Sequence, residues 1–244
     1  LERIQNAVGN LNHLLANASA EELTEEEGHL VDEYFKENVY PVLYNLERLI
    51  ALGNVHVHVD LIAGLPYESY ELFRRSFDKV YALHADALQL GFLKVLAGTP
   101  LAAEVERHSI IYRQYAPYEV ISTAYISAWE LARLKMIEEM LDTYYNRGGF
   151  SHTIAYLIEA VGEGAFRLYE KLADFYYASG FQHRERKKDD QYRILLQFAR
   201  TLAQERDEPA IEETALKMLT RDAEQSMNPE NLKRFLRKGW EVKK

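Results

Sequence analysis

Hydrophobic side chains recur at helical spacing along the first fifty residues of the chain. The apolar positions that share this spacing are Ile4, Val8, Leu11, Leu15, Leu43, Leu46, Leu49 and Ile50. Between them, Ser19 precedes a pair of glutamates, which is typical of a helix start. Pro41 interrupts or restarts the helix that follows. We therefore expect helices up to about Gly53.

Alternating polar and β-branched residues predict two strands in the next segment. Residues 55–63 alternate and stop at Gly64, and residues 87–95 stop before Gly98. Between them lies an amphipathic helix whose apolar face consists of Leu72, Phe73, Phe77, Val80 and Tyr81. The connection is long enough for a right-handed crossover, so this strand–helix–strand order predicts a parallel pair.

Helical periodicity dominates the rest of the chain. A short helix is expected over 100–108, and residues 110–125 are expected to be irregular or weakly extended. Ser127 and Glu130 form a capping box that opens a strong helix, which the glycine pair 148–149 ends. Aromatic side chains at helical spacing indicate a core or, alternatively, a binding groove. Further helices are predicted near 151–161, 165–179, 189–206, 209–223 and 229–238, with the charged stretch 183–190 as a solvated loop.

The fold class that follows is α/β and then all-α, with helix dominant. Two strands cannot form an α/β barrel, which needs about eight βα units, and a two-stranded sheet is marginal alone. Either further strands precede this chain or helices cover the pair. The predicted domains are residues 1–125, with a partial βαβ unit, and residues 126–244, which are helical.

Composition narrows the classes of function. The chain has 244 residues, no cysteine and a formal net charge of −9. Without cysteine it has no disulfide, no thiolate nucleophile and no cysteine-ligated zinc or iron–sulfur site. The acidic balance argues against a nucleic-acid partner. No apolar stretch approaches the ~18–20 residues that span a bilayer, and no signal-peptide pattern opens the chain. We expect a cytoplasmic protein without membrane contact and, since it begins at Leu1 rather than methionine, a fragment.

Candidate chemistry lies where the first predicted strand ends. Ligands of parallel α/β proteins bind beyond the carboxyl ends of the strands, and Gly64 would allow the backbone to approach a ligand closely. The same stretch also suits an ordinary strand–turn–helix connection, in which Pro66 and Glu68 begin the helix. Both interpretations stay open at the level of these residues.

Polar residues also share faces of the two predicted strands. His56, His58 and Asp60 lie on one face of the first strand. This row suits a metal or acid–base chemistry, or polar side chains that neighbours satisfy. The second strand places on one face Gln89, Gly91 and Leu93. A glycine there indicates either the close approach of a ligand or tight helix–sheet packing.

Five segments occur in an order that is similar to one known family. They are LGNVHVHVDLIAGLP (52–66), FRRSFD (73–78), LQLGFLKVLAGTP (88–100), YAPYEV (115–120) and YYNRGGF (144–150). Together they resemble the cobalamin-binding-domain radical S-adenosylmethionine (SAM) proteins that end in a helical domain of unknown function, over about residues 46–200. The resemblance implies a cobalamin-binding domain and an early barrel with a three-cysteine loop for an iron–sulfur cluster. The three-cysteine loop is absent from this sequence, and the region around residues 21–28 is expected to form an acidic helix instead.

The resemblance also implies which residues border the cofactor. Its strand-end motif, which residues 63–65 match, borders the adenine and ribose of SAM, and the strand that residues 88–93 match flanks the adenine. The implied cofactor-binding residues are His58, Asp60, Ala63, Gly64, Leu65, Gln89, Gly91 and Leu93. No catalytic residue and no metal ligand is assigned, because the cluster that cleaves SAM would lie outside the chain.

Two functions follow as alternatives. The first is the C-terminal fragment of a cobalamin-dependent radical SAM enzyme, inactive alone, which contributes the pocket wall for SAM and a small-molecule or other substrate. A homodimer is compatible with it, because a truncated barrel leaves open strand edges. The second is a helical protein-interaction module with a small α/β cap, which would bind a partner through residues 127–240.

Overall fold

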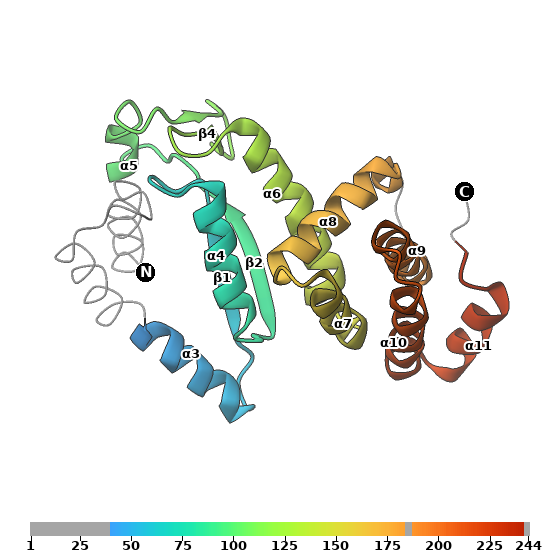
Figure 1. The fold of residues 1–244 in the computed structure, drawn as a ribbon. Coiled ribbons are helices and arrows are strands. Elements are labelled where there is room, and N and C mark those ends of the chain that lie inside the picture. The colour runs from blue at the N-terminus through green and yellow to red at the C-terminus, as the bar shows by residue number, and fades with distance from the viewer. Residues whose placement is uncertain (1–39, 184–186, 242–244) are drawn as a thin grey trace. The chain divides into compact units, whose positions relative to one another are not determined.

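The computed structural model describes residues 40–183 and 187–241, which form two compact units divided between Lys135 and Met136 (Figure 1). The helices expected around residues 4–15 and after Ser19 lie outside the described residues. Helix α3 (Tyr40–Leu52) carries the last N-terminal apolar stripe. Pro41 lies in the first turn of this helix, where its missing N–H leaves no helical hydrogen bond unmade.

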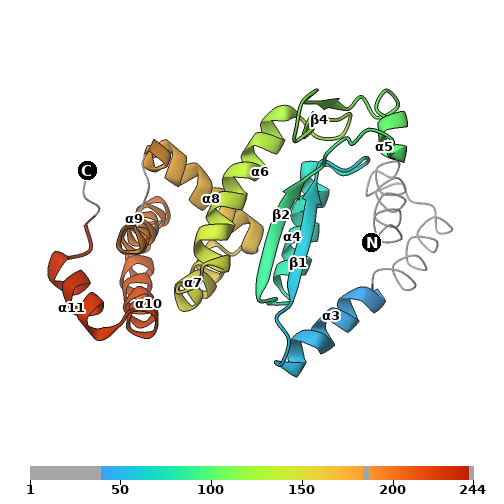
Figure 2. The same ribbon diagram turned by 180° about the vertical axis from the view of Figure 1, so that it is seen from behind.

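The first unit is built on a parallel strand pair, as predicted. Strand β1 (His58–Ala63) pairs with β2 (Ala87–Phe92), and Asp60 lies opposite Gln89. Helix α4 (Tyr70–Tyr81) connects them, and the Ser69 hydroxyl caps it by accepting a hydrogen bond from Leu72 N at 3.3 Å. α4 covers one face of the pair in both views (Figures 1 and 2). Its buried side chains are Phe73, Phe77 and Tyr81.

Both strands are shorter than the alternation predicts, because the backbone finds other partners. Val57 N donates to Asp86 Oδ2 at 2.7 Å rather than to a neighbouring strand. Beyond Phe92 the chain turns to a new segment, since Val120 N donates to Leu93 O at 2.8 Å. The expected weakly extended segment at 110–125 therefore contains a short antiparallel hairpin, β3 (Ile111–Tyr112) and β4 (Val120–Ser122).

The helix expected over 100–108 is wrong in extent. Helix α5 spans only Pro100–Ala103, because Glu104 leaves helical geometry with φ −106° and ψ 5°. Thr99 does not cap it with its side chain. Its hydroxyl donates instead to Leu96 O at 2.7 Å. Residues 104–109 continue as turns.

Helix α6 (Ala128–Leu141) begins with the predicted capping box. Ser127 N donates to Glu130 Oε2 at 2.8 Å, and Glu130 N donates to Ser127 Oγ at 3.2 Å. The helix continues as a π-helical turn, η2 (Asp142–Asn146), before the glycine pair 148–149. The division between the two units lies inside α6, whereas the predicted domain boundary precedes this helix.

The second unit is helical throughout its described residues, in agreement with the periodicity. It contains α7 (Ser151–Val161), α8 (Ala165–Ala178), the 3₁₀ turn η3 (Phe181–His183), α9 (Lys188–Arg206), α10 (Ala210–Ser226) and α11 (Pro229–Lys238). Most of the aromatic side chains are core, as the first interpretation held. Among the most completely buried are Tyr144, Phe150, Phe166, Tyr169, Tyr192 and Phe235.

The predicted class, α/β and then all-α with helix dominant, is confirmed. Within the described ranges, each of the two sheets has two strands, so neither forms a barrel by itself. No helix there combines the length and the apolar character needed to cross a bilayer.

Candidate functional site

The β1–β2 pair has two chemically different faces. Residues that are paired across neighbouring strands project to the same side, so His58, Asp60, Gln89 and Gly91 share a face. Leu88 and Leu90 project to the other side and are buried. His58, Asp60 and Gln89 are exposed, so their face is the one that α4, which covers one side of the pair in Figure 2, leaves open. The structure therefore brings together the polar residues that the sequence places on the two strands.

The strand-end residues are divided between the two faces. Ala63 is fully buried, and its partner across the strands is Phe92. Gly64 follows with φ +90°, a conformation that glycine adopts at no steric cost. A Cβ at position 64 would lie 3.6 Å from the Leu131 side chain of α6 and 3.8 Å from Leu93 Cβ. Apolar side chains therefore pack against Gly64, and Leu65 beside it is half-buried.

Gly91 has a different environment from the one that tight packing predicts. It lies on the face away from α4, so helix–sheet packing against α4 does not explain it. A Cβ there would meet Leu61 O at 3.6 Å, an ordinary contact, and its φ is not positive. A side chain would fit at position 91, so the reason for glycine is not found in the packing of the described residues.

The row of histidines and aspartate does not gather into a metal-binding group. His56 and His58 contact each other edge to face, with ring centroids 4.7 Å apart. His56 Nδ1 lies 3.6 Å from Asp86 Oδ1. Across residues 40–183 and 187–241, no three side chains of the histidine, cysteine, aspartate and glutamate types come close enough to hold an ion.

Glu68 is a candidate that the sequence interpretation placed wrongly. It was expected in the first turn of a helix, but α4 begins at Tyr70 and Glu68 precedes the capping Ser69. Its side chain is 3% exposed, and Oε2 is buried without a hydrogen-bond partner. Burial raises the pKa of this carboxyl to about 8. Nothing in the local pattern shows this burial, because it depends on what packs over the turn.

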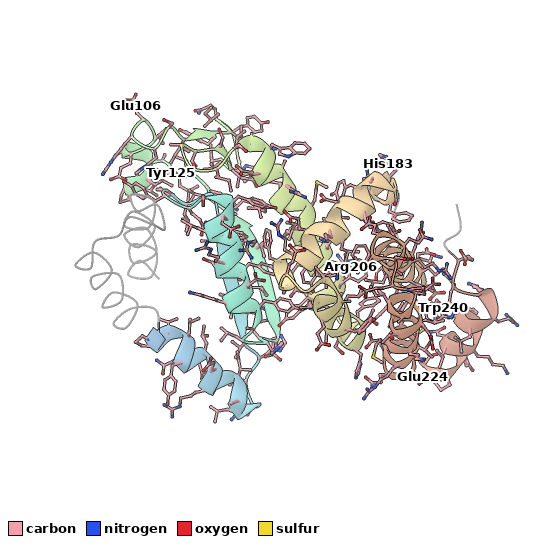
Figure 3. All side chains as sticks on the ribbon, viewed as in Figure 1. Glu106, Tyr125, His183, Arg206, Glu224 and Trp240 are labelled. Atoms are coloured by element: carbon pink, nitrogen blue, oxygen red, sulfur yellow. The ribbon has the colours of Figure 1, made fainter. Side chains whose placement is uncertain are left out.

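A second group missed by the sequence lies at the same end of the unit. The rings of Tyr67, His108 and Tyr125 are in mutual contact, with centroids 4.8–6.0 Å apart. His108 is buried, and its two ring nitrogens lie 3.2 Å from the Tyr125 hydroxyl and 3.2 Å from Glu104 Oε2. Tyr125 is labelled in Figure 3, beside the loop that leads into α4. We call Tyr67, Glu104, His108 and Tyr125 the tyrosine–histidine cluster.

The second unit holds one buried carboxylate with a full set of donors. Asp222 of α10 accepts hydrogen bonds from His152 N, His152 Nδ1, Thr153 N and Thr153 Oγ1 at 2.6–3.1 Å. These donors belong to the first turn of α7, so Asp222 acts as a helix cap supplied by another helix. Nearby, the Tyr192 hydroxyl donates to Gly149 O at 2.7 Å. This group anchors the 144–150 segment and the start of α7.

Comparison with known proteins places the larger part of the chain in one family. A family profile described as "Protein of unknown function (DUF4080)" matches residues 106–244, from the α5–β3 loop to the C-terminus. A search of curated proteins finds no match to the chain. The match covers more than half of the 244 residues. The chain therefore belongs to the DUF4080 family of proteins of unknown function.

Proposed function

We propose that the chain is the C-terminal part of a radical SAM enzyme of the cobalamin-dependent type. In this proposal β1, α4 and β2 form part of the barrel wall that faces SAM and the substrate, and the helical unit follows that wall. The observation that carries the proposal is the parallel β1–α4–β2 unit, with α4 on one face and exposed polar side chains on the other.

This division of faces is the one that a barrel wall requires. In α/β barrels the helices lie outside, and the strand side chains opposite them point to the interior. His58, Asp60 and Gln89 occupy that side here. The resemblance also implies a helical C-terminal domain of unknown function, and the match of residues 106–244 to a family of proteins of unknown function is compatible with it.

The residues of this chain suit SAM but not the iron–sulfur cluster that the resemblance implies. An iron–sulfur cluster of this class needs three thiolates, and the chain has no cysteine. The cluster does not fit here, and we assign it no step. The proposal places SAM on the exposed face, where an imidazole, a carboxylate and an amide offer donors and acceptors. When bound, SAM supplies the radical chemistry, and the residues of this chain bind and orient it. No observation on the described residues indicates cobalamin contact.

The first test is the reading frame that precedes Leu1 in the parent gene. The proposal expects a three-cysteine loop upstream and a cobalamin-binding domain before it. A complete reading frame that contains no such loop contradicts the proposal.

The second test uses the protein encoded by that complete frame, reconstituted anaerobically with iron and sulfide. Asp60→Ala and Gln89→Ala should each weaken SAM binding about fivefold, the effect of one lost hydrogen bond. Glu213→Ala is the matched control, since Glu213 is exposed on α10, where its carboxylate pairs with Lys217 at 2.8 Å. Equal SAM affinity in all three variants contradicts the placement of SAM on this face.

The alternative, an interaction module that binds through residues 127–240, finds less support. Among the described residues of the second unit, Leu236 is the large apolar side chain that stands exposed. The other exposed apolar side chains after β2 are in the first unit: Leu96, Ile111, Tyr115, Tyr118, Ile121 and Trp129. Within the described part of residues 127–240, Trp129 is therefore the one large aromatic side chain that is exposed, at 76%, and a single ring does not make the contiguous aromatic surface that this alternative requires. A homodimer stays a prediction, which sedimentation equilibrium over a range of concentrations can check.

A further inference from the structure

We propose that the tyrosine–histidine cluster is a hydrogen-atom relay, in which Tyr67 and Tyr125 pass a hydrogen atom to a carbon-centred radical of a bound substrate. The proposal rests on the function proposed above for the supply of that radical. It concerns a different end of the unit from the His58–Asp60–Gln89 face, and it is carried by different residues.

The geometry places two phenols and one imidazole in a continuous line of contact. The Tyr67 and Tyr125 rings are 4.8 Å apart at 46°, and the Tyr67 ring meets His108 edge to face at 5.0 Å. The Tyr125 hydroxyl lies 3.2 Å from His108 Nδ1. Burial and the neighbouring Tyr67, which shares a hydrogen bond with Tyr125, raise the pKa of Tyr125. The phenol therefore keeps its hydrogen at neutral pH.

Glu104 determines which ring nitrogen of His108 carries a hydrogen. The Glu104 carboxylate can only accept, so the histidine Nε2, 3.2 Å away, carries a hydrogen and donates it. Nδ1 lies 3.2 Å from the Tyr125 oxygen, and the Tyr125 hydroxyl also shares a hydrogen bond with Tyr67.

Three separate segments are held in place to build the cluster. Ala124 N donates to His108 O at 2.9 Å, and Thr123 Oγ1 accepts from Tyr125 N at 3.1 Å. Tyr67 has φ +66°, an unusual conformation for an aromatic residue, immediately after β1 and Pro66. Such strained residues concentrate at functional sites, where the surrounding structure holds them. The carboxyl end of a parallel strand is also where ligands of these folds bind.

The transfer balances as two hydrogen-atom steps. The carbon radical takes the hydroxyl hydrogen of Tyr67, so that a C–H bond forms, the O–H bond breaks and Tyr67 becomes a phenoxyl radical. The Tyr67 radical then takes the hydroxyl hydrogen of Tyr125, so that one O–H bond forms and one breaks. The unpaired electron ends on Tyr125, hydrogen-bonded to His108.

The test generates tyrosyl radicals in the 244-residue chain without SAM, by pulse radiolysis with azide radicals, and follows their decay by absorbance and freeze-quench EPR. In the wild type we expect a long-lived tyrosyl fraction. Tyr125→Phe should abolish it, and His108→Gln should speed its decay about tenfold. Tyr115→Phe is the control, because Tyr115 is 68% exposed and outside the cluster. Circular dichroism checks that each variant is folded.

The outcomes separate a relay from a purely structural cluster. Decay that is unchanged in folded Tyr67→Phe and Tyr125→Phe variants overturns the relay, because the relay places the long-lived radical on Tyr125 and routes it through Tyr67. If the Tyr125→Phe variant does not fold, the Tyr67→Phe variant, which keeps the aromatic ring, is the one that tests the relay. Since the assay needs no SAM, the two proposals fail separately. A long-lived Tyr125 radical in the 244-residue chain, together with no SAM cleavage by the reconstituted complete protein, contradicts the proposed function, which supplies the substrate radical, while the radical-holding pair of Tyr125 and His108 stands.

Discussion

At the scale of single residues, buried charge is the most informative feature of this protein. Glu68 and Asp222 are both almost completely buried, yet their surroundings differ. Asp222 accepts four hydrogen bonds, whereas Glu68 Oε2 has none. Burial without a hydrogen bond to Oε2 raises the pKa of Glu68, whereas the four donors to Asp222 satisfy its two oxygens and tie α10 to the start of α7. Substitutions of the two residues should therefore change the free energy of unfolding in opposite directions.

The Glu68→Gln variant should keep a constant free energy of unfolding over the pH range in which the wild type becomes less stable. The pKa of Glu68 is raised from 4.5 to about 8 in the folded protein. The folded state thus binds more protons, so this group's contribution is complete below pH 4.5 and disappears as pH rises through about 8. At pH 9 the variant should be roughly 2–5 kcal/mol more stable than the wild type in urea denaturation.

The control for this prediction is Glu106→Gln, which changes an exposed glutamate of the same unit. It should leave the free energy of unfolding of the wild type almost unchanged at both pH 6 and pH 9. A Glu68→Gln variant that loses stability with pH as steeply as the wild type would show that Glu68 is ionised in the folded protein.

Asp222→Ala should destabilise the second unit by roughly 3–5 kcal/mol. The substitution leaves two backbone N–H groups, an imidazole and a hydroxyl without their acceptor, and Thr153 among them is fully buried. Thr153→Val removes one of the four bonds and should cost about 1 kcal/mol. Equal unfolding midpoints for the two variants in urea would contradict the capping role of Asp222.

At the scale of elements, the loop between η2 and α7 shows how one turn depends on distant helices. Gly148 and Gly149 have φ values of +66° and +89°. A Cβ at Gly148 would meet no atom within 4 Å, whereas at Gly149 it would lie 2.7 Å from Lys188 Nζ and 3.3 Å from Ser226 Cβ. α9 and α10 therefore close over Gly149 and leave Gly148 open.

Gly149→Ala should cost more stability than Gly148→Ala. Both introduce a side chain at positive φ, which costs about 1 kcal/mol, but only position 149 adds a steric conflict. We expect a further loss of about 1–2 kcal/mol for Gly149→Ala. Shortening the neighbour in Gly149→Ala/Lys188→Ala should recover part of it. Equal losses at the two glycines, measured by thermal unfolding, would show that Lys188 and Ser226 move away freely.

At the scale of the whole molecule, the described chain behaves as two units, each with its own core. Phe73 is buried against the strand pair in the first unit, and Phe235 is buried in the second, where it contacts Tyr192 and Trp240. Domains with separate cores unfold separately unless a large apolar interface joins them. Unfolding should therefore show two transitions in calorimetry.

Each transition should respond to one of two matched substitutions. Phe73→Ala should lower only the first unit's transition and Phe235→Ala only the second unit's, each by about 3–5 kcal/mol in unfolding free energy. One cooperative transition that both variants shift equally would show that the two units fold together.

Particular residues show how far sequence reasoning reaches in this chain. The bounds of α7 and α11 agree with the prediction. Gly162 ends α7 and Asn228 caps the start of α11, and these signals, like apolar spacing, act within a few residues. The shared face of His58, Asp60 and Gln89 was also predictable, since side chains alternate along a strand. The tyrosine–histidine cluster was not, because residues 67, 104–108 and 125 meet only through the folded loops.

The sequence by itself determined the order of the elements, the parallel strand pair and the absence of any thiolate chemistry in this chain. These follow from local periodicity and from composition, which do not depend on distant contacts. Only the tertiary structure decided which polar groups are buried, that Leu131 packs against Gly64, and that Tyr67, His108 and Tyr125 touch. Burial and contact are properties of segments far apart in the chain, and hydrogen bonding and desolvation, which set reactivity, act only across those contacts.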